Sequence, residues 1–176
     1  INVASQFMTH IQTAISLAAI ITFPYIIYEV WKFIRPALFD NEIKHLRPAF
    51  LGGTVMFFIG CAIGYLLVFP FTFRFLMEYE LSASIHNQIN LSSYIGNFTM
   101  LILVMGIVFE MPLLAWLLSS LGLLNKGMLT EYRRHAVVVL LVGAAFITPS
   151  GDPFTLMLVF IPLYVLYELS ILVVRK

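Results

Sequence analysis

The amino-acid sequence predicts an all-α, polytopic membrane protein, because of its composition and the spacing of its charges. Of 176 residues, 61% are hydrophobic and only 11% are charged, whereas a soluble domain carries about 25% charged residues. So few charges disfavour a disordered chain, and the formal net charge of +1 disfavours a basic nucleic-acid-binding protein. The charges are also clustered, so the stretches between them are candidate membrane spans.

Three uncharged stretches are long enough to cross a bilayer, which takes about 20 apolar residues. Residues 1–28, 48–73 and 81–109 contain no Asp, Glu, Lys or Arg. We therefore predict transmembrane helices near residues 7–29, 49–73 and 93–120.

The C-terminal part predicts two further, short helices. Between Arg134 and Asp152 lie 17 uncharged residues, and the turn-forming sequence at 149–153 must end a helix. A helix at 136–148 reaches only about 20 Å, so it thins the bilayer locally or forms a re-entrant hairpin with a fifth helix near 154–174. No repeat or linker divides the chain, and we treat residues 1–176 as one membrane domain.

The basic residues predict the orientation, since they prefer the cytoplasmic side. Nine of the ten Lys and Arg residues lie between the first and second spans, between the third and fourth, or at the C-terminus. Only Arg74 lies on the other side, where we expect outer connections at about 74–92 and 149–153. The N-terminus of this chain is then outside and its C-terminus cytoplasmic, which indicates a missing earlier helix.

Signatures of enzymes are absent from the sequence. It contains no Gly-x-Ser-x-Gly, no His-Glu-x-x-His, no phosphate-binding glycine loop and no Cys-x-x-Cys. The single cysteine, Cys61, has no Cys or His at metal-ligand spacing. We predict a protein that is not an enzyme and binds no metal or cofactor.

Glu110 is the ionisable residue that most needs an explanation. It follows 29 uncharged residues and precedes Met111-Pro112. A charge at membrane depth costs about 2.5–3.5 kcal/mol, and Pro112 removes a helical hydrogen bond and bends the helix. We favour a functional polar notch; the alternative is a protonated carboxyl bonded to the freed carbonyl or to a neighbouring helix.

Three other features carry specific expectations. Asp40 and Glu42 lie in the basic connection between the first and second spans, where a carboxylate could bind a guanidinium. Alternatively, Asp40 could cap the N-terminus of a helix and Lys44 could pair with it one turn later. The spacing favours neither interpretation. Gly60 and Gly64 form a small-xxx-small pattern that predicts close helix contact. Glu168 is expected to reach the interface or pair with a basic residue.

An ordered series of motifs resembles the TatC family, the multi-spanning subunit of the twin-arginine protein translocase. The motifs follow the family order along essentially the whole chain: Phe23-Pro24, Tyr28 to Leu38, Asn41-Glu42, Gly64-Tyr65, Phe69-Pro70, Phe109-Glu110-Met111-Pro112, Ile147 to Asp152, Ile161-Pro162 and Tyr167-Glu168.

The resemblance implies six transmembrane helices in the inner (cytoplasmic) membrane with both termini cytoplasmic, so the first helix is lacking here. It implies a core receptor subunit that, with TatB and other TatC copies, binds twin-arginine signal peptides of folded precursor proteins. TatA is then recruited, and export across the lipid bilayer is driven by the proton-motive force.

The family's site residues carry over onto matching positions. Glu42, Phe33 and Lys44 are implied to bind the signal peptide. Glu110 is implied to contact polar groups of TatA or TatB, with Thr148 at a polar position beside it.

Asp152 matches the acid of the family's periplasmic turn. Two positions depart from the family: the turn reads Pro-Ser-Gly-Asp where Pro-Pro-Asp is frequent, and Leu156 stands where some members carry a polar residue.

Two other functions remain as alternatives. A proton-coupled secondary transporter of a small solute could use Glu110, but it favours an internal repeat and further ionisable residues near the midplane, which are not clear here. A purely structural membrane scaffold would leave Glu42 and Glu110 freely replaceable.

Overall fold

The computed structural model describes residues 3–37, 46–78, 91–148 and 152–174, and every element in these ranges is helical. The predicted all-α fold class is therefore confirmed. In chain order the elements are α1 (Val3–Ile34), η1 (Arg35–Ala37), α3 (Leu46–Ile63), η2 (Gly64–Val68), α4 (Phe69–Glu78), α5 (Leu91–Val108), α6 (Met111–Ser120), α7 (Lys126–Glu131), α8 (Arg133–Ile147) and α9 (Pro153–Val173).

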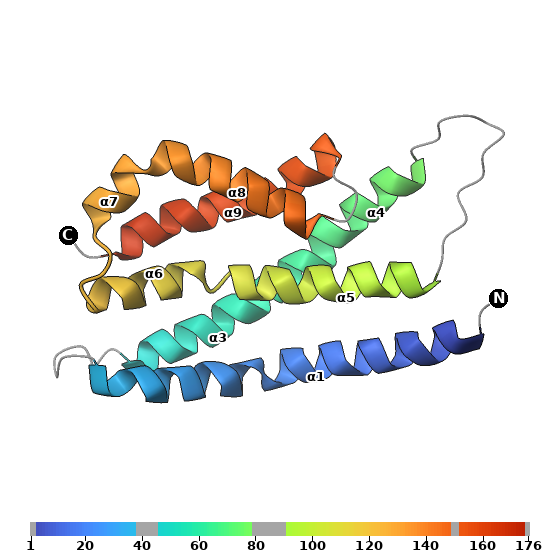
Figure 1. Cartoon of the computed structure of the whole chain (residues 1–176), viewed down its shortest axis with the longest axis horizontal. Coiled ribbons are helices and arrows are strands. Elements are labelled where there is room, and N and C mark those ends of the chain that lie inside the picture. Colours follow the sequence, from blue (N-terminus) through green and yellow to red (C-terminus); the bar gives the residue numbers. More distant parts are fainter. Residues whose placement is uncertain (1–2, 38–45, 79–90, 149–151, 175–176) are drawn as a thin grey trace.

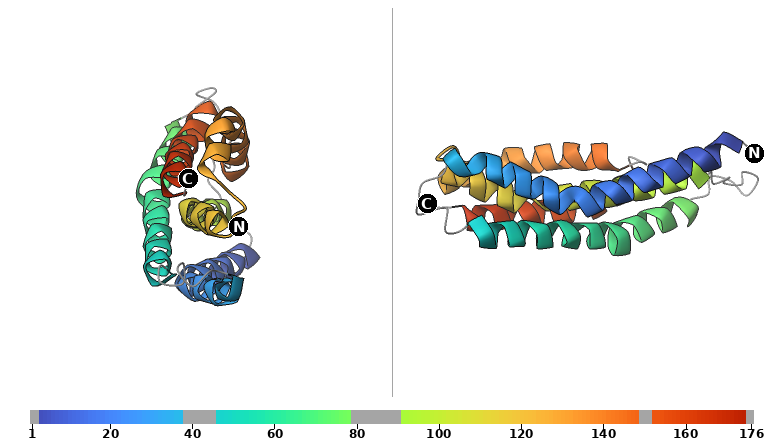
Figure 2. Two further views of the ribbon diagram at one scale, coloured as in Figure 1. Left: turned by 90° about the vertical axis from the view of Figure 1, so that its left-hand side faces the viewer. Right: turned by 90° about the horizontal axis from the view of Figure 1, so that it is seen from below.

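The long helices lie side by side in a slab, as Figure 1 shows. α5 and α6 follow one another through its middle; α5 packs against α1 and α3, and α6 packs against α9, which in turn contacts α8. The continuous run of α3, η2 and α4 crosses the others diagonally, and Figure 2 shows that it lies on one side of them. The α5–α6 pair is thus the centre of the bundle.

Four helical segments of the described residues are long and apolar enough to span a membrane: Gln6–Ile34, Pro48–Glu78, Ser92–Ser120 and Pro153–Val173. They correspond to the predicted spans at 7–29, 49–73, 93–120 and 154–174. α8 has 15 residues, about 22 Å at 1.5 Å per residue, so the prediction of a short fourth helix is confirmed. α9 has 21 residues, about 31 Å, and is shorter than the other three candidate spans, which have 29–31 residues.

The second span is longer than predicted at its outer end. η2 is a π-helical segment that continues directly into α4, which ends at Glu78. Arg74 and Glu78 face each other one helical turn apart, with 2.7 Å between Nε and Oε1. The predicted outer connection at 74–92 therefore starts too early by about one helical turn.

Close contact between α3 and α5 depends on glycine. A Cβ atom at Gly60 would lie 2.6 Å from the backbone oxygen of Met105, and one at Gly64 would lie 3.2 Å from Cα of Ile102. Gly106 lies on the opposing helix, where a Cβ atom would lie 2.6 Å from the Cys61 sulfur. The close helix contact predicted from Gly60 and Gly64 is confirmed.

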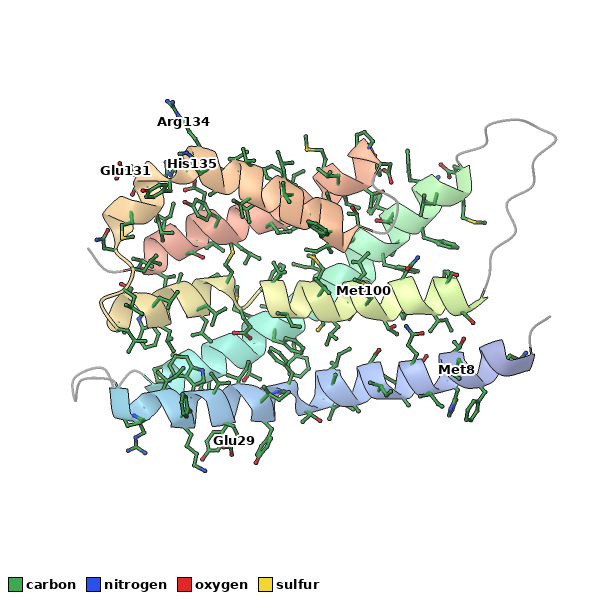
Figure 3. The ribbon with its side chains drawn as sticks, in the orientation of Figure 1. Met8, Glu29, Met100, Glu131, Arg134 and His135 are labelled. Atoms are coloured by element: carbon green, nitrogen blue, oxygen red, sulfur yellow. The ribbon has the colours of Figure 1, made fainter. Side chains whose placement is uncertain are left out.

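The basic residues gather at one end of the bundle. Lys32 is in the last turn of α1, Arg35 is in η1, and Arg133 begins α8. Figure 1 places these helix ends and the C-terminus together, opposite the N-terminus and the end of α4. Arg134 lies at this basic end and points away from the helices, as Figure 3 shows.

Candidate functional site

The central helix is interrupted at Glu110. α5 ends at Val108 and α6 begins at Met111, and between them Phe109 and Glu110 form a turn. Pro112 is in the first turn of α6, where its missing N–H costs nothing. The Glu110 backbone N–H donates to the carbonyl of Ile107 at 3.1 Å, three residues back, which tightens the turn. The helix is thus interrupted where the sequence predicted a bend beside Glu110.

The Glu110 side chain is buried at this break without a hydrogen-bond partner. The residue is 6% exposed, and within the described parts of the chain neither carboxyl oxygen has a partner. The alternative in which the carboxyl bonds to a freed carbonyl or a neighbouring helix is therefore wrong for the described residues. Leaving such a group unpaired costs about 1–3 kcal/mol, so the site favours a ligand that supplies a hydrogen bond.

The Glu110 carboxyl lies against α3 beside an apolar groove. A Cβ atom at Gly53 would lie 3.0 Å from Oε2 of Glu110. Gly53 also lines a groove of about 520 Å³ between α3, α6 and α9. The other lining residues are almost all apolar: Ala49, Gly52, Met56, Pro112, Leu113, Trp116, Leu169 and Val173.

Phe33 lies on the surface at the basic end of α1. It is 83% exposed, whereas Trp31 is 7% exposed and contacts the Trp116 ring at a centroid distance of 5.7 Å. Two residues along a helix of 3.6 residues per turn point in nearly opposite directions, so the burial of Trp31 turns Phe33 outward. The other two residues expected to bind the signal peptide, Glu42 and Lys44, lie outside the described residues.

Thr148 and Asp152 lie at the two ends of the α8–α9 connection. Thr148 is buried, and its hydroxyl donates to the carbonyl of Ala145 at 3.4 Å, so this hydrogen bond stays within its own helix end. Asp152 caps α9, because its Oδ2 accepts the backbone N–H of Thr155 at 2.7 Å. The structure joins neither residue to Glu110 by a hydrogen bond in the described parts.

The sequence predicted only part of the hydrogen bonding of Glu168. Glu168 on α9 accepts from Arg133 at 2.9 Å and from the Tyr164 hydroxyl at 3.1 Å. The expected pairing of Glu168 with a basic residue is confirmed, but Arg133 is 35 positions away in the chain. The neighbouring Tyr167 donates its hydroxyl to the carbonyl of Leu129 at 2.6 Å. These contacts fix α7 and α8 onto α9.

Titratable groups do not form a metal centre in the described residues, where no group of three or more His, Cys, Asp and Glu side chains could hold an ion. Of the residues expected to bind partners or the signal peptide, Glu110 is a buried carboxyl in the middle of the bundle and Phe33 is an exposed aromatic residue at its basic end.

A family model and individual relatives of known sequence both match this chain to TatC proteins. The sequence model of the family described as Sec-independent protein translocase protein (TatC) matches residues 1–162. The TatC protein of Blattabacterium sp. subsp. Periplaneta americana is 39% identical over 170 residues, which are 97% of this chain and 64% of that protein. The TatC protein of Helicobacter pylori strain 26695 is 39% identical over 168 residues, 96% of this chain and 66% of that protein.

Solved structures show the same fold. The crystal structure of the twin-arginine translocase receptor TatC in DDM matches with a TM-score of 0.84 and 30% identity, covering 97% of this chain and 75% of that one. A second crystal structure of this receptor gives a TM-score of 0.76 at 32% identity, with 90% and 69% coverage. The chain spans about two thirds of the length of the curated relatives it matches. This helical, multi-pass membrane chain belongs to the TatC family.

Proposed function

We propose that the chain is the core of a receptor subunit of the twin-arginine translocase. It binds twin-arginine signal peptides of folded precursor proteins and recruits TatA and TatB for export driven by the proton-motive force. The observation that carries this proposal is the buried, unpaired Glu110 carboxyl in a membrane-spanning segment. The two solved relatives, both of which are twin-arginine translocase receptors, support it.

The signal-peptide site is proposed at the basic end of the bundle, on the cytoplasmic side of the inner membrane. Phe33 supplies an exposed apolar contact there. Glu42 binds a guanidinium of the arginine pair through paired hydrogen bonds, which a lysine cannot form, and Lys44 also takes part in binding the signal peptide. In this orientation the N-terminus of the chain is periplasmic and its C-terminus is cytoplasmic.

The partner site is proposed at the middle of the membrane. A helix of TatA or TatB that carries a polar side chain would supply the hydrogen bond that Glu110 lacks, and Thr148 would add a second polar contact. Other copies of TatC and the lipid bilayer complete the environment. No step of this function requires the chain to act as an enzyme or to bind a cofactor.

A crosslinking experiment tests the receptor function. A photoreactive residue at position 33 of the full-length protein is exposed to a signal peptide carrying Arg-Arg or Lys-Lys, with Glu42 intact or replaced by Gln. We expect a strong crosslink only for Arg-Arg with Glu42 intact. Equal crosslinking in all four combinations would contradict the proposed recognition of the arginine pair. The connection that carries Glu42 would then serve only as a basic anchor at the membrane surface.

Copurification tests the partner site. Glu110→Ala in the full-length protein should reduce copurification of TatA or TatB while the protein remains folded. Glu131→Ala, at an exposed acid on α7, is the matched control and should change nothing. Unchanged copurification of both partners with Glu110→Ala would contradict the proposed role, and solute uptake by liposomes containing the protein alone would then favour the transporter.

A further inference from the structure

We propose that Gly53 is a positioning residue that keeps the Glu110 carboxyl in its buried place between α3 and α6. Nothing at position 53 projects beyond the helix backbone, and the acid and Leu113 occupy the space that a side chain would take. Any effect of Gly53 on partner recruitment rests on the function proposed above. The effect of Gly53 on the position of the Glu110 carboxyl does not depend on that function.

The side chains of Leu113 and Glu110 occupy the space beside Gly53. A Cβ atom at this position would lie 3.0 Å from Oε2 and 3.6 Å from Oε1 of Glu110, and it would overlap Cδ2 of Leu113. Gly53 is buried. Both carboxyl oxygens therefore lie over the backbone of α3 at the one residue type that leaves room for them.

The other close-packed glycines have a different role. At Gly60 an added Cβ atom would meet the backbone oxygen of Met105 at 2.6 Å, and at Gly106 it would meet the buried Cys61 and Phe57 side chains. Those glycines allow two helices to approach. At Gly53 the obstacles are the ends of two flexible side chains, which can move while the helices stay in place.

This difference predicts what substitution does. Alanine at position 53 displaces the ends of Leu113 and Glu110, and valine, with two more methyl groups, displaces them further. The carboxyl then leaves its pocket while the backbone fold is kept. A partner helix that finds the acid at a fixed depth would lose its hydrogen bond even though Glu110 is unchanged.

Gly52 provides a matched control one residue away. A Cβ atom at Gly52 meets nothing within 4 Å, although Gly52 lines the same groove. Substitution at position 52 therefore changes the helix propensity and the groove surface as substitution at position 53 does, but it does not displace the Glu110 carboxyl.

The test measures the position of the carboxyl directly. Full-length protein with Gly53→Ala, Gly53→Val, Gly52→Ala or Gly52→Val is treated in detergent with a hydrophobic carbodiimide, and modification of Glu110 is quantified by mass spectrometry. We expect modification to rise severalfold for Gly53→Val, less for Gly53→Ala, and not at all for the Gly52 variants. The melting midpoint of each variant is measured in parallel.

The outcomes separate the inference from the proposed function. Raised modification with reduced TatA or TatB capture supports both. Raised modification with normal capture supports the positioning role of Gly53 and contradicts the role of Glu110 in recruitment. Modification equal to that of the Gly52 variants overturns the inference. If Gly53→Val melts at a lower temperature than Gly52→Val, the modification of Glu110 is compared between Gly53→Ala and Gly52→Ala instead. Equal modification in this pair also overturns the inference.

Discussion

α1 and the α5–α6 pair are both apolar enough to span a membrane, but they are buried to very different extents. Of an apolar stretch of 18 residues in each segment, 6% is buried within Gln6–Ile34, against 44% within Ser92–Ser120. α1 also runs unbroken through Pro24, whereas the central segment stops at Glu110, just before Pro112. Both segments carry a proline, and only the central one is interrupted.

The comparison shows that apolar composition determines which segments span, but not how they pack. Lipid is as apolar as leucine, so helices in a membrane associate through close packing and polar contacts. The central segment has such features in Gly106, which admits Phe57 and Cys61, and in the buried Glu110. α1 presents large apolar side chains such as Ile21, which is 75% exposed. Measurements on matched residues test this difference in packing.

The largest effect is expected where α3 and α5 touch. Gly60→Leu places a side chain against the backbone oxygen of Met105 and the Cβ atom of Phe109, so the helices must separate. Overpacking of this kind should lower the free energy of unfolding by about 3 kcal/mol. Gly143→Leu on α8, where an added Cβ atom meets nothing within 4 Å, is the control in thermal melts; equal midpoints would refute close packing at Gly60.

A smaller effect is expected from a methionine at the centre. Met105→Ala removes a side chain that is 0% exposed and leaves a cavity; because lipid is also apolar, we expect the low end of the usual range, about 2 kcal/mol. Met100 on α5 and Met8 on α1, labelled in Figure 3, are 52% and 61% exposed. Their alanine variants should change stability by less than about 0.5 kcal/mol.

Urea or thermal unfolding in one detergent compares the three methionine variants. If Met8→Ala destabilises as much as Met105→Ala, α1 is not peripheral, and the contrast between the two regions fails.

The smallest effect is expected at the polar contact that joins α1 to α5. The hydroxyls of Thr9 and Ser92 lie 2.8 Å apart, and Thr9→Val removes this hydrogen bond with little change of shape. Interhelical hydrogen bonds in membrane proteins contribute about 0.6 kcal/mol on average. A double-mutant cycle with Ser92→Ala measures the coupling, and a coupling of zero would show that packing alone holds α1.

The sequence predicted where the helices are because charge-free stretches, turn residues and basic clusters are local signals. The same local reasoning predicted a bend next to Pro112, where the structure has a turn at Phe109–Glu110, and singled out Glu110. It also placed the last helix within one residue of its observed bounds, because Asp152-Pro153 is a local start signal.

Contacts between distant residues were harder to foresee. Arg133 and Glu168 are 35 positions apart, and their pairing depends on how α8 lies on α9. Gly53 carries no signal that separates it from Gly52, because their difference is the direction each faces on α3. Glu42 and Lys44 remain predictions, as they lie outside the described residues.

We propose that Glu110 is kept unpaired for a partner, at a cost to the stability of the chain alone. The most direct test is the melting midpoint of the purified full-length protein with Glu110 or with Glu110→Met, with and without TatA and TatB. We predict that methionine raises the midpoint of the protein alone, since an unpaired buried polar group costs about 1–3 kcal/mol, and removes the stabilisation by the partners. A lower midpoint for Glu110→Met alone, with partner stabilisation retained, would contradict the account.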